Sequence, residues 1–420
     1  MRSPYWSLWA VIALGIALLS SQALASQGGT IRIVTYGTHE SLDEVAKHFM
    51  ADHPEYRVEV ETYGFGEYPQ KIPVMIATNA APDIFQTWAQ YKAPWIEAGL
   101  IMDMTPFWSR HADLADGLFP FVMETVLYDG KYWGVPHDFN SEVWILAKDR
   151  FDAAGIPVPY DDWTVDEFRQ YASLLTDREG RWLGAANPVA GGWGSSWQWA
   201  RNWTGHGWVS EDFTEALVDK AEYVEMLTFF VEMVTQDESM NGAGLAAPQD
   251  VWSGGYSMWQ GWVDYSFRLA QNARYEFRFA TMPRGRFGQK AFAQGHMWSV
   301  PFNAPNPEGA FVFLEWLMSR RGQEVMVTVG QRQPLSPDLE LWERYFAQLP
   351  PSSRDHVRSF VFDVLYGQGN VDIMRYWTTW PQVNEVMVRY LGQVFSLQKS
   401  PANAMTQAAQ EIRSHLRARE

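Results

Sequence analysis

The sequence predicts an α/β fold in which mostly parallel strands are covered by helices on both faces. Two observations lead to this fold class. Short β-rich segments at 30–36, 57–62 and 81–85 alternate with segments of helical periodicity at 41–51 and 68–79. The 420 residues are 47% hydrophobic and 20% charged, which suits two or three globular domains and argues against wholesale disorder.

The helices of this pattern carry their own sequence evidence. The first opens with 41–44 (SLDE), a capping box, and continues with apolar residues at helical spacing. Pro73 falls inside the second helix and should kink or interrupt it. Further helices are expected over 161–175, where 164–167 (TVDE) is a second capping box, over 212–235, from 307 onward, and over 382–395, the last long helix.

An export signal precedes the first strand. Arg2 supplies a short basic region, and 8–19 is an apolar stretch shorter than the ~20 residues that span a bilayer. The small-x-small pattern at 23–25 (ALA) is typical of a cleavage site. We expect cleavage after Ala25, which removes the signal peptide 1–25 and leaves a free periplasmic protein. An uncleaved membrane anchor is the alternative.

The composition excludes several kinds of partner and chemistry. The net charge of −16 makes nucleic acid a poor partner, because affinity for phosphates comes from lysine and arginine. The absence of cysteine excludes disulfides, thiolate metal sites, a cysteine nucleophile and a lipid-modified N-terminal cysteine. His39-Glu40 and His137-Asp138 each offer one or two metal ligands, but neither pair completes a site. No metal and no cofactor are therefore expected.

Tryptophan is the most unusual feature, with 22 residues in the chain. Indole rings can stack on the apolar faces of sugars, but they also fill large cores, and for the glycine-rich cluster at 191–199 both interpretations stay open. Neither a Gly-x-Ser-x-Gly elbow nor a Walker-type loop occurs. Paired carboxylates beside such rings would suit a glycosidase, and the candidates are Asp83, Asp138, Glu142 and Asp264.

Four segments of the chain resemble the extracellular solute-binding proteins of carbohydrate-importing ABC systems, the family that includes maltose-binding protein. The most specific is 128–136 (YDGKYWGVP), which is similar to the family's Y-D-G-K-x-Y-G-V-P stretch. The others are 80–84 (AAPDI), 149–164 and 309–317. Where many members have Tyr-Asn-Lys-Asp, this chain has 146–149 (LAKD), a difference that bears on details of the ligand.

The resemblance implies a periplasmic-binding-protein type II fold, with two α/β lobes joined by hinge strands and the ligand in the cleft between them. The N-terminal lobe is expected to comprise 26–138 plus 296–336, and the C-terminal lobe 139–295 plus 337–420. The same resemblance implies a monomeric receptor that is not an enzyme. It would close on a carbohydrate and deliver it to membrane permease subunits.

Matched position by position, the resemblance also implies contacts in the cleft. In the first lobe these are Thr38, His39, Phe65, Gln86 and Trp88. In the second lobe they are Asn140, Trp193, Trp197, Trp259, Trp262 and Asp264. His296 lies near the expected return crossing, and Arg332 is the expected charge contact, for example to an acidic sugar.

Two other functions stay open at this level. One is a receptor for glycerol phosphate, which would need several cationic side chains in the cleft, or for a polyamine, which would need acids around aromatic rings. The other is a secreted glycoside hydrolase, which would cleave the glycoside that a receptor binds and releases intact.

Overall fold

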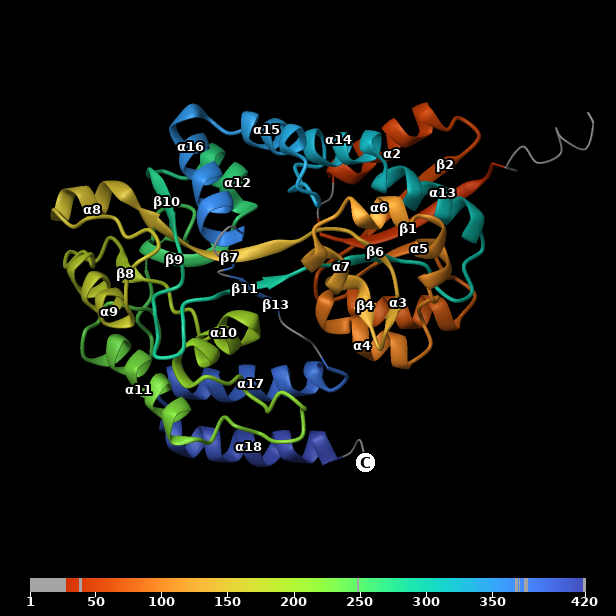
Figure 1. Cartoon of the computed structure of the whole chain (residues 1–420). Coiled ribbons are helices and arrows are strands. Elements are labelled where there is room, and N and C mark those ends of the chain that lie inside the picture. The colour runs from red at the N-terminus through yellow and green to blue at the C-terminus, as the bar shows by residue number, and fades with distance from the viewer. Residues whose placement is uncertain are drawn as a thin grey trace, which may run out of the picture.

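The computed structural model describes residues 28–417 apart from 38–39, 248, 367–368, 370 and 374–376, with all their side chains except those of Glu40 and Trp193. The expected signal peptide and the candidates Thr38 and His39 lie outside the described residues. Figure 1 shows two α/β lobes side by side, connected by long strands. In the described part of the chain, no helix is long and apolar enough to cross a membrane.

The described residues of the first lobe form a five-stranded sheet. Its strands are β1 (Thr30–Tyr36), β2 (Arg57–Tyr63), β3 (Ile84–Thr87), β6 (Val135–Pro136) and β12 (Met297–Ser299). The order is β2-β1-β3-β12-β6, with β1 parallel to β2 and β3, and β12 antiparallel to β3 and β6. The predicted β-α-β-α-β unit is confirmed here, because the three N-terminal strands are parallel.

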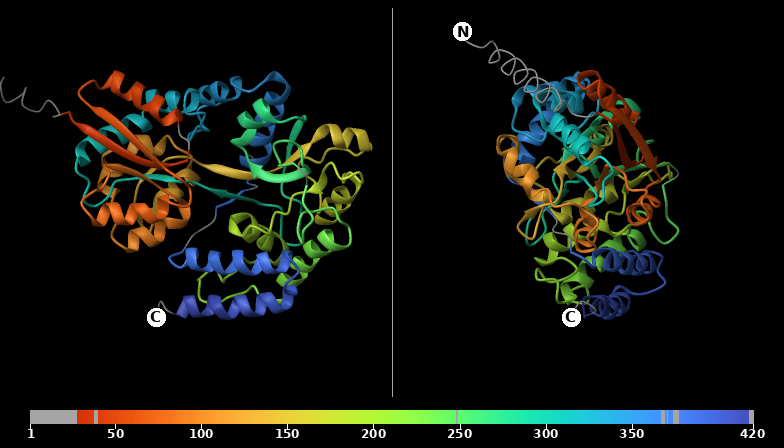
Figure 2. Two further views of the ribbon diagram at one scale, coloured as in Figure 1. Left: turned by 180° about the vertical axis from the view of Figure 1, so that it is seen from behind. Right: turned by 90° about the vertical axis from the view of Figure 1, so that its right-hand side faces the viewer.

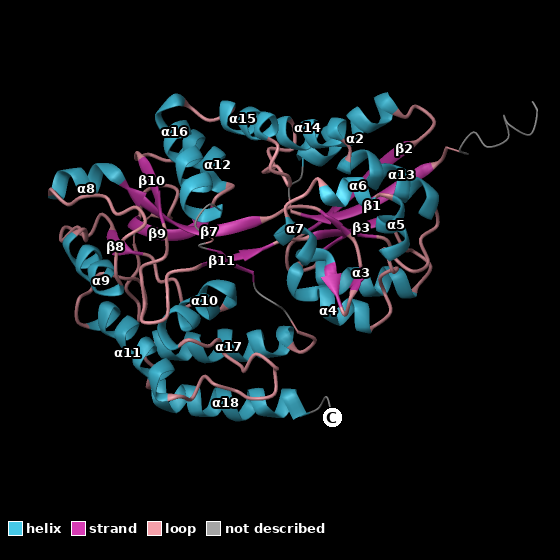
Figure 3. Cartoon of the chain, viewed as in Figure 1, coloured by secondary structure: helices cyan, strands magenta, loops and turns pink. Residues whose placement is uncertain are grey.

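Helices cover the first sheet on both faces (Figure 3). They are α2 (Glu40–Asp52), α3 (Tyr68–Ala77), α4 (Ala89–Glu97), α5 (Thr105–Arg110), α6 (Ala112–Asp116), α7 (Pro120–Val126), α13 (Pro307–Met318) and α14 (Arg320–Thr328). On one face, Phe49 of α2 packs edge to face against Phe313 and Trp316 of α13, with ring centroids 4.9 and 5.5 Å apart. The C-terminal part of this lobe therefore packs against its N-terminal part.

In the described residues, the second lobe contains a mixed sheet with the strand order β13-β11-β7-β9-β8. A sixth strand, β10, also pairs with β7. Its strands are β7 (Asn140–Ala147), β8 (Leu183–Ala185), β9 (Tyr256–Trp262), β10 (Phe277–Ala280), β11 (Ala291–Gln294) and β13 (Val371–Ile373). Because β7 is antiparallel to β9, β10 and β11, this sheet departs from the mostly parallel arrangement predicted from the N-terminal pattern.

Helices also surround the second sheet. They are α8 (Lys148–Ala154), α9 (Val165–Leu174), α10 (Trp193–Thr204), α11 (Ala221–Thr235), α12 (Tyr265–Asn272), α15 (Leu339–Ala347), α16 (Pro351–Ser359), the π-helix η1 (Phe360–Tyr366), α17 (Trp380–Phe395) and α18 (Pro401–Arg417). Figure 2 shows α17 and α18 side by side along the lower edge of this lobe.

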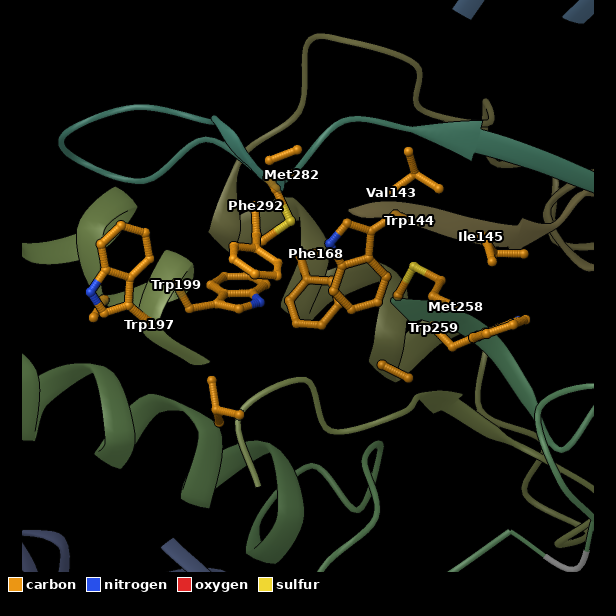
Figure 4. Packing of buried hydrophobic residues seen from close by; sticks show 14 of the residues in the cluster. Val143, Trp144, Ile145, Phe168, Trp197, Trp199, Met258, Trp259, Met282 and Phe292 are labelled. Atoms are coloured by element: carbon orange, nitrogen blue, oxygen red, sulfur yellow. The ribbon is translucent and has the colours of Figure 1, made fainter. Parts of the chain in front are cut away.

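Tryptophans fill much of the second core. Figure 4 shows Phe168 between Trp144 and Trp199, and the ring centroids of Trp144 and Phe168 are 4.8 Å apart. Trp144 and Trp199 are almost completely buried and meet edge to face at 6.2 Å. Edge-to-face contacts are favourable for aromatic quadrupoles, so these rings stabilise the lobe through packing.

The chain passes between the two sheets along adjacent segments. It leaves the first sheet after Pro136 and enters the second at Asn140, and it returns between Gln294 and Met297. A third passage lies between α14 and α15. Strands β7 and β11 extend toward the first lobe and form the visible connection in Figure 1.

The segment 128–136 folds as a hairpin followed by a close strand contact. Strands β4 (Leu127–Tyr128) and β5 (Lys131–Tyr132) pair antiparallel, and Asp129 and Gly130 have φ angles of 49° and 71°. Asp-Gly is the preferred pair for such a left-handed two-residue turn. Beyond it, a Cβ on Gly134 would lie 2.6 Å from the carbonyl oxygen of Trp298, so only glycine fits there.

Three helix predictions need correction. Helix α2 begins at Glu40, so 41–44 lies within its first turn and is not the predicted N-cap. The helix predicted over 212–235 begins only at Ala221, as α11. The segment before it forms a turn, in which the Glu215 N–H donates to Ser210 Oγ at 2.9 Å. The predicted last helix is followed by α18, whose inner face contains alanines that give a weak apolar pattern.

The second capping box is confirmed and gives a stability prediction. The Glu167 N–H donates to Thr164 Oγ1 at 3.2 Å, and the Thr164 N–H donates to Glu167 Oε2 at 2.8 Å. We expect Thr164→Ala to lower the free energy of unfolding by about 1 kcal/mol, because a helix-terminal N–H loses its partner. Urea unfolding measures this loss. Thr228→Ala is the control, since the exposed Thr228 hydroxyl only donates within α11; equal losses would contradict the role of the cap.

Candidate functional site

Aromatic side chains gather where the three parallel strands of the first lobe end. Tyr36 ends β1, Phe65 follows β2 by two residues, and Trp88 directly follows β3. The rings of Phe65 and Trp88 stack at 4.5 Å, and Tyr36 meets Trp88 edge to face at 4.4 Å. Trp88 is buried, whereas Phe65 is 53% exposed. Because the carboxyl ends of parallel strands meet at one edge, these rings form one platform with Phe65 outermost.

Asp138 joins the two segments that pass between the sheets. Its Oδ2 lies 2.8 Å from His137 Nδ1, and its Oδ1 lies 2.8 Å from His296 Nδ1 and accepts the His296 backbone N–H at 2.9 Å. Burial acts to raise the pKa of Asp138, but the two histidines outweigh it and hold this pKa well below its usual range. Asp138 is thus an ionised group that ties the outgoing segment to the returning one.

A second series of hydrogen bonds connects the third passage between the lobes to the second lobe. Gln333 Nε2 donates to Asn140 Oδ1 at 3.2 Å, and the Tyr366 hydroxyl donates to Gln333 Oε1 at 3.1 Å. Asn140 begins β7, Gln333 lies in the third passage, and Tyr366 ends the π-helix η1. π-Helical turns are frequent at functional positions. In η1, the last residue is Tyr366, whose hydroxyl bonds to Gln333, the residue after Arg332.

Asp264 lies where the two lobes meet. Burial raises the pKa of its carboxyl, while the charge of Arg332 and a hydrogen bond from Asn140 lower it. Its Oδ1 is buried and has no hydrogen-bond partner among the described residues. A buried carboxylate oxygen without a donor is costly, which makes it a natural acceptor for a ligand.

Tyr36 is electrostatically coupled to groups of both lobes. Burial is the main cause that raises its pKa, and the charges of Asp138 and Asp264 raise it further, while Arg332 opposes them. Asp264 follows β9 by two residues and directly precedes α12 in the second lobe, whereas Tyr36 ends β1 in the first. The aromatic platform and the Asp264 carboxylate are therefore expected to face one site between the lobes.

Glu142 lies on β7 within the second lobe. The Ser195 hydroxyl donates to its Oε1 at 2.5 Å, and Gln260 Nε2 donates to its Oε2. Burial raises the pKa of Glu142 to about 8 despite these two hydrogen bonds. Trp199 Nε1 in turn donates to Gln260 Oε1 at 3.1 Å. Glu142 is thus largely protonated at neutral pH, and both its oxygens are used inside the lobe.

The tryptophans predicted to contact the ligand are buried to different extents. Trp197 is 7% exposed, with the Arg201 guanidinium 4.8 Å from its ring, and Trp259 is 3% exposed, with its Nε1 donating to the Tyr275 hydroxyl at 2.8 Å. Trp262 is half-buried beside other aromatic rings of the same core. The side chain of Trp193 lies outside the described residues.

Gln86 is completely buried in the first sheet. It accepts the Thr35 hydroxyl at 2.8 Å, and its Nε2 lies 3.3 Å from His137 Nδ1. The structure therefore brings Phe65, Trp88, Asn140, Asp264, His296 and Arg332 toward one interlobe site, and Gln86 supports it from within the sheet. Contact of these residues with a ligand stays a prediction.

Sequence reasoning did not select Tyr36, His137 and Gln333 for the site, and it treated Asp138 only as a metal ligand or a catalytic acid. The usable signal for Tyr36 was its position at a strand end, next to the selected residues 38 and 39. In the described residues, His137, Asp138 and His296 do not form a metal site, and no other group of His, Asp or Glu side chains does.

Two lobes with aromatic rings and a buried carboxylate near the segments that join them are typical of a protein that binds a small solute between its lobes. The family comparison agrees: residues 44–348 match the bacterial extracellular solute-binding proteins, and the chain belongs to that family. The fold is the type II periplasmic-binding-protein fold.

Solved structures of similar fold cover nearly the whole chain. An ABC substrate-binding protein from Listeria monocytogenes in complex with cycloalternan is 22% identical, with a TM-score of 0.82 over 92% of this chain and 98% of that one. A maltose-bound protein of T. maritima is 17% identical, with a TM-score of 0.76 over 92% and 100%. A solute-binding protein from Agrobacterium radiobacter in complex with ribitol is 19% identical, with a TM-score of 0.75 over 92% and 99%.

Proposed function

We propose that this protein is the extracytoplasmic receptor of an ABC importer, and that it binds a carbohydrate or polyol between its lobes and delivers it to a membrane permease. The observation that supports the ligand class is the buried Asp264 Oδ1, which has no donor among the described residues, together with the electrostatic coupling of Asp264 to Tyr36 of the aromatic platform. Sugar hydroxyls would donate to this oxygen while an apolar sugar face lies against Phe65.

The relatives support this ligand class. The similar structures contain cycloalternan, maltose and ribitol, which share several hydroxyls and no charge. A phosphate ligand would need several cationic side chains in the site. Among the charged groups with the largest effects on the pKa of Asp264, only Arg332 carries a positive charge at every physiological pH. A polyamine would suit the acids and rings, so it remains the alternative that the ligand screen must separate.

The arrangement of carboxylates argues against a glycosidase. That reaction needs two carboxyl groups facing one bond, one as an acid and one as a base or nucleophile. Both oxygens of Glu142 are bound by Ser195 and Gln260, and both oxygens of Asp138 are bound by histidines. The oxygens of Asp83 accept the backbone N–H groups of Arg32 and Asn306. Among these four candidates, Asp264 would thus act without a second free carboxyl.

The rest of the proposal concerns placement and partners. We propose lobe boundaries at 26–138 plus 296–336 and at 139–295 plus 337–420, cleavage of the signal peptide after Ala25, and a periplasmic monomer. The proposed ligand contacts are Thr38, His39, Phe65, Gln86, Trp88, Asn140, Trp193, Trp197, Trp259, Trp262, Asp264, His296 and Arg332. With a net charge of −16, nucleic acid is not proposed as a partner.

A thermal-shift screen of residues 26–420, stripped of carried ligand by partial unfolding, tests the proposal. The panel contains mono-, di- and oligosaccharides, polyols, glycerol phosphate and polyamines. We expect one carbohydrate or polyol class to raise the midpoint, because a ligand at 100 times its Kd stabilises the folded state by about 2.7 kcal/mol. A shift only with phosphates or amines would contradict the ligand class. Consumption of the sugar would contradict the receptor and favour the hydrolase.

A further inference from the structure

The two lobes also touch away from the strands that connect them. The N-terminal end of α17 lies beside α4 of the first lobe, as Figure 1 shows. There the Thr378 hydroxyl of the second lobe donates to Glu97 Oε1 of the first lobe at 2.6 Å. The Tyr128 hydroxyl donates to the same oxygen at 2.5 Å. One carboxylate thus receives a hydroxyl from each lobe.

Aromatic stacking holds Thr378 on the second lobe. Its neighbour Trp377 is 3% exposed and stacks on Phe213 at 4.8 Å with an interplanar angle of 17°. Trp380 is 1% exposed and stacks on Trp208 at 5.1 Å with an angle of 3°. A buried ring on either side leaves the intervening backbone little freedom, so the position of Thr378 follows the position of the second lobe.

Glu97 is fixed to the first lobe in a corresponding way. It is the last residue of α4, and Tyr128 of the β4–β5 hairpin orients its carboxylate. The nine residues of α4 separate it from Trp88 by roughly 13 Å at 1.5 Å per residue. Glu97 is therefore remote from the aromatic platform, although it lies on the same helix that begins there.

We propose that Glu97 and Thr378 form a latch that stabilises the closed arrangement of the lobes and thereby sets solute affinity without touching the solute. Each residue is fixed to a different lobe, so a rotation that moves α17 away from α4 separates them. The apparent Kd scales inversely with the fraction of the chain that is already closed. The consequence for affinity rests on the proposed receptor function, whereas the latch itself is a property of the solute-free chain.

The latch can be tested by distance measurement in the solute-free protein. The chain has no cysteine, so Val74→Cys on α3 and Val388→Cys on α17 give two unique sites for spin labels, both on exposed residues. Pulsed dipolar EPR then reports the populations of closed and open lobes. We expect Glu97→Ala and Thr378→Val each to lower the closed-to-open ratio about two- to tenfold, as for the loss of one hydrogen bond.

A double variant and two controls make this test decisive. Glu97→Ala/Thr378→Val should equal the stronger single variant, because both changes remove one shared interaction. Thr328→Val and Glu44→Ala remove an exposed hydroxyl and an exposed carboxylate from other helices of the first lobe and should leave the ratio unchanged. Unchanged single variants, additive losses, or a solute-free chain with no closed population would each overturn the latch. Failure of the ligand screen would leave this result intact.

Discussion

Asp264→Ala is expected to lower the affinity for the identified carbohydrate by about 2–5 kcal/mol, which is roughly 30-fold or more. The reason is that solute hydroxyls lose their acceptor in a buried site. The same change should not lower the stability of the solute-free chain, because burial already disfavours this carboxylate and raises its pKa. Isothermal titration calorimetry measures the affinity, and thermal unfolding without solute measures the stability.

The combination of lost binding and retained stability identifies a ligand contact. The exposed Asp116 at the end of α6 provides the matched control, and Asp116→Ala should change neither quantity. Asp264→Asn keeps the shape of the side chain and should retain part of the affinity, since its amide oxygen can still accept one hydroxyl. Unaltered binding by Asp264→Ala would remove the central support for a sugar at this position.

Glu142→Gln is expected to make the protein more stable than the wild type at alkaline pH. The pKa of Glu142 is about 8 in the folded chain against 4.5 as its ordinary value. Between these values the folded state binds more protons than the unfolded state, so the free energy of unfolding falls as the pH rises and levels off above about pH 8. The full loss is at most about 5 kcal/mol. Glutamine has no proton to release, and its amide can still bond to Ser195 and Gln260.

Unfolding by urea at pH 5, 7 and 9 measures this effect. We expect the variant to match the wild type near pH 5 and to exceed it by a few kcal/mol at pH 9, within the limit given by the pKa difference. Glu179→Gln, on a largely exposed carboxylate, is the control and should not change the pH dependence. Asp264 adds a slope of the same sign, because its pKa is also raised. A Glu142→Gln profile parallel to that of the wild type would show that Glu142 is ionised in the folded chain.

The protonation of Glu142 affects the charge near Asp264 and Tyr265. Tyr265 is influenced by both Glu142 and Asp264, and its pKa is raised to about 12 by burial and then by these two acids. A protonated Glu142 removes its part of this negative charge. Glu142 therefore serves the packing of β7, β9 and α10, whereas Asp264 is the proposed acceptor for solute hydroxyls.

Local elements were largely predictable because their signals lie within a few residues. Strands β1 and β2 and the capping box at Thr164 follow from alternation and from one four-residue motif. Helix α18 was missed because Ala404, Ala408 and Ala409 supply much of its buried face, and alanine contributes little to an apolar pattern. Its stability comes from packing on α17 and α11 rather than from its own sequence.

The assignment of tryptophans to core or site required the tertiary structure. Trp259 and Trp262 lie on the same strand, yet Trp259 is 3% exposed, with its N–H bonded to Tyr275 inside the second lobe, whereas Trp262 is half-buried. Sequence composition predicts many aromatic contacts and cannot say which ring faces a partner lobe. That distinction depends on the direction in which each strand or helix presents its side chain.

By itself the sequence determined the alternation of strands and helices in the first lobe and the capping box at 164–167, because each depends on neighbours a few positions apart. Only the tertiary structure decided that Asp138 would bond to His296, 158 residues away, and that Asp264 Oδ1 would be buried without a donor in the described part of the chain. Such contacts arise when two lobes fold and meet. Burial and long-range charge then set the pKa of each group, and no local pattern encodes either quantity.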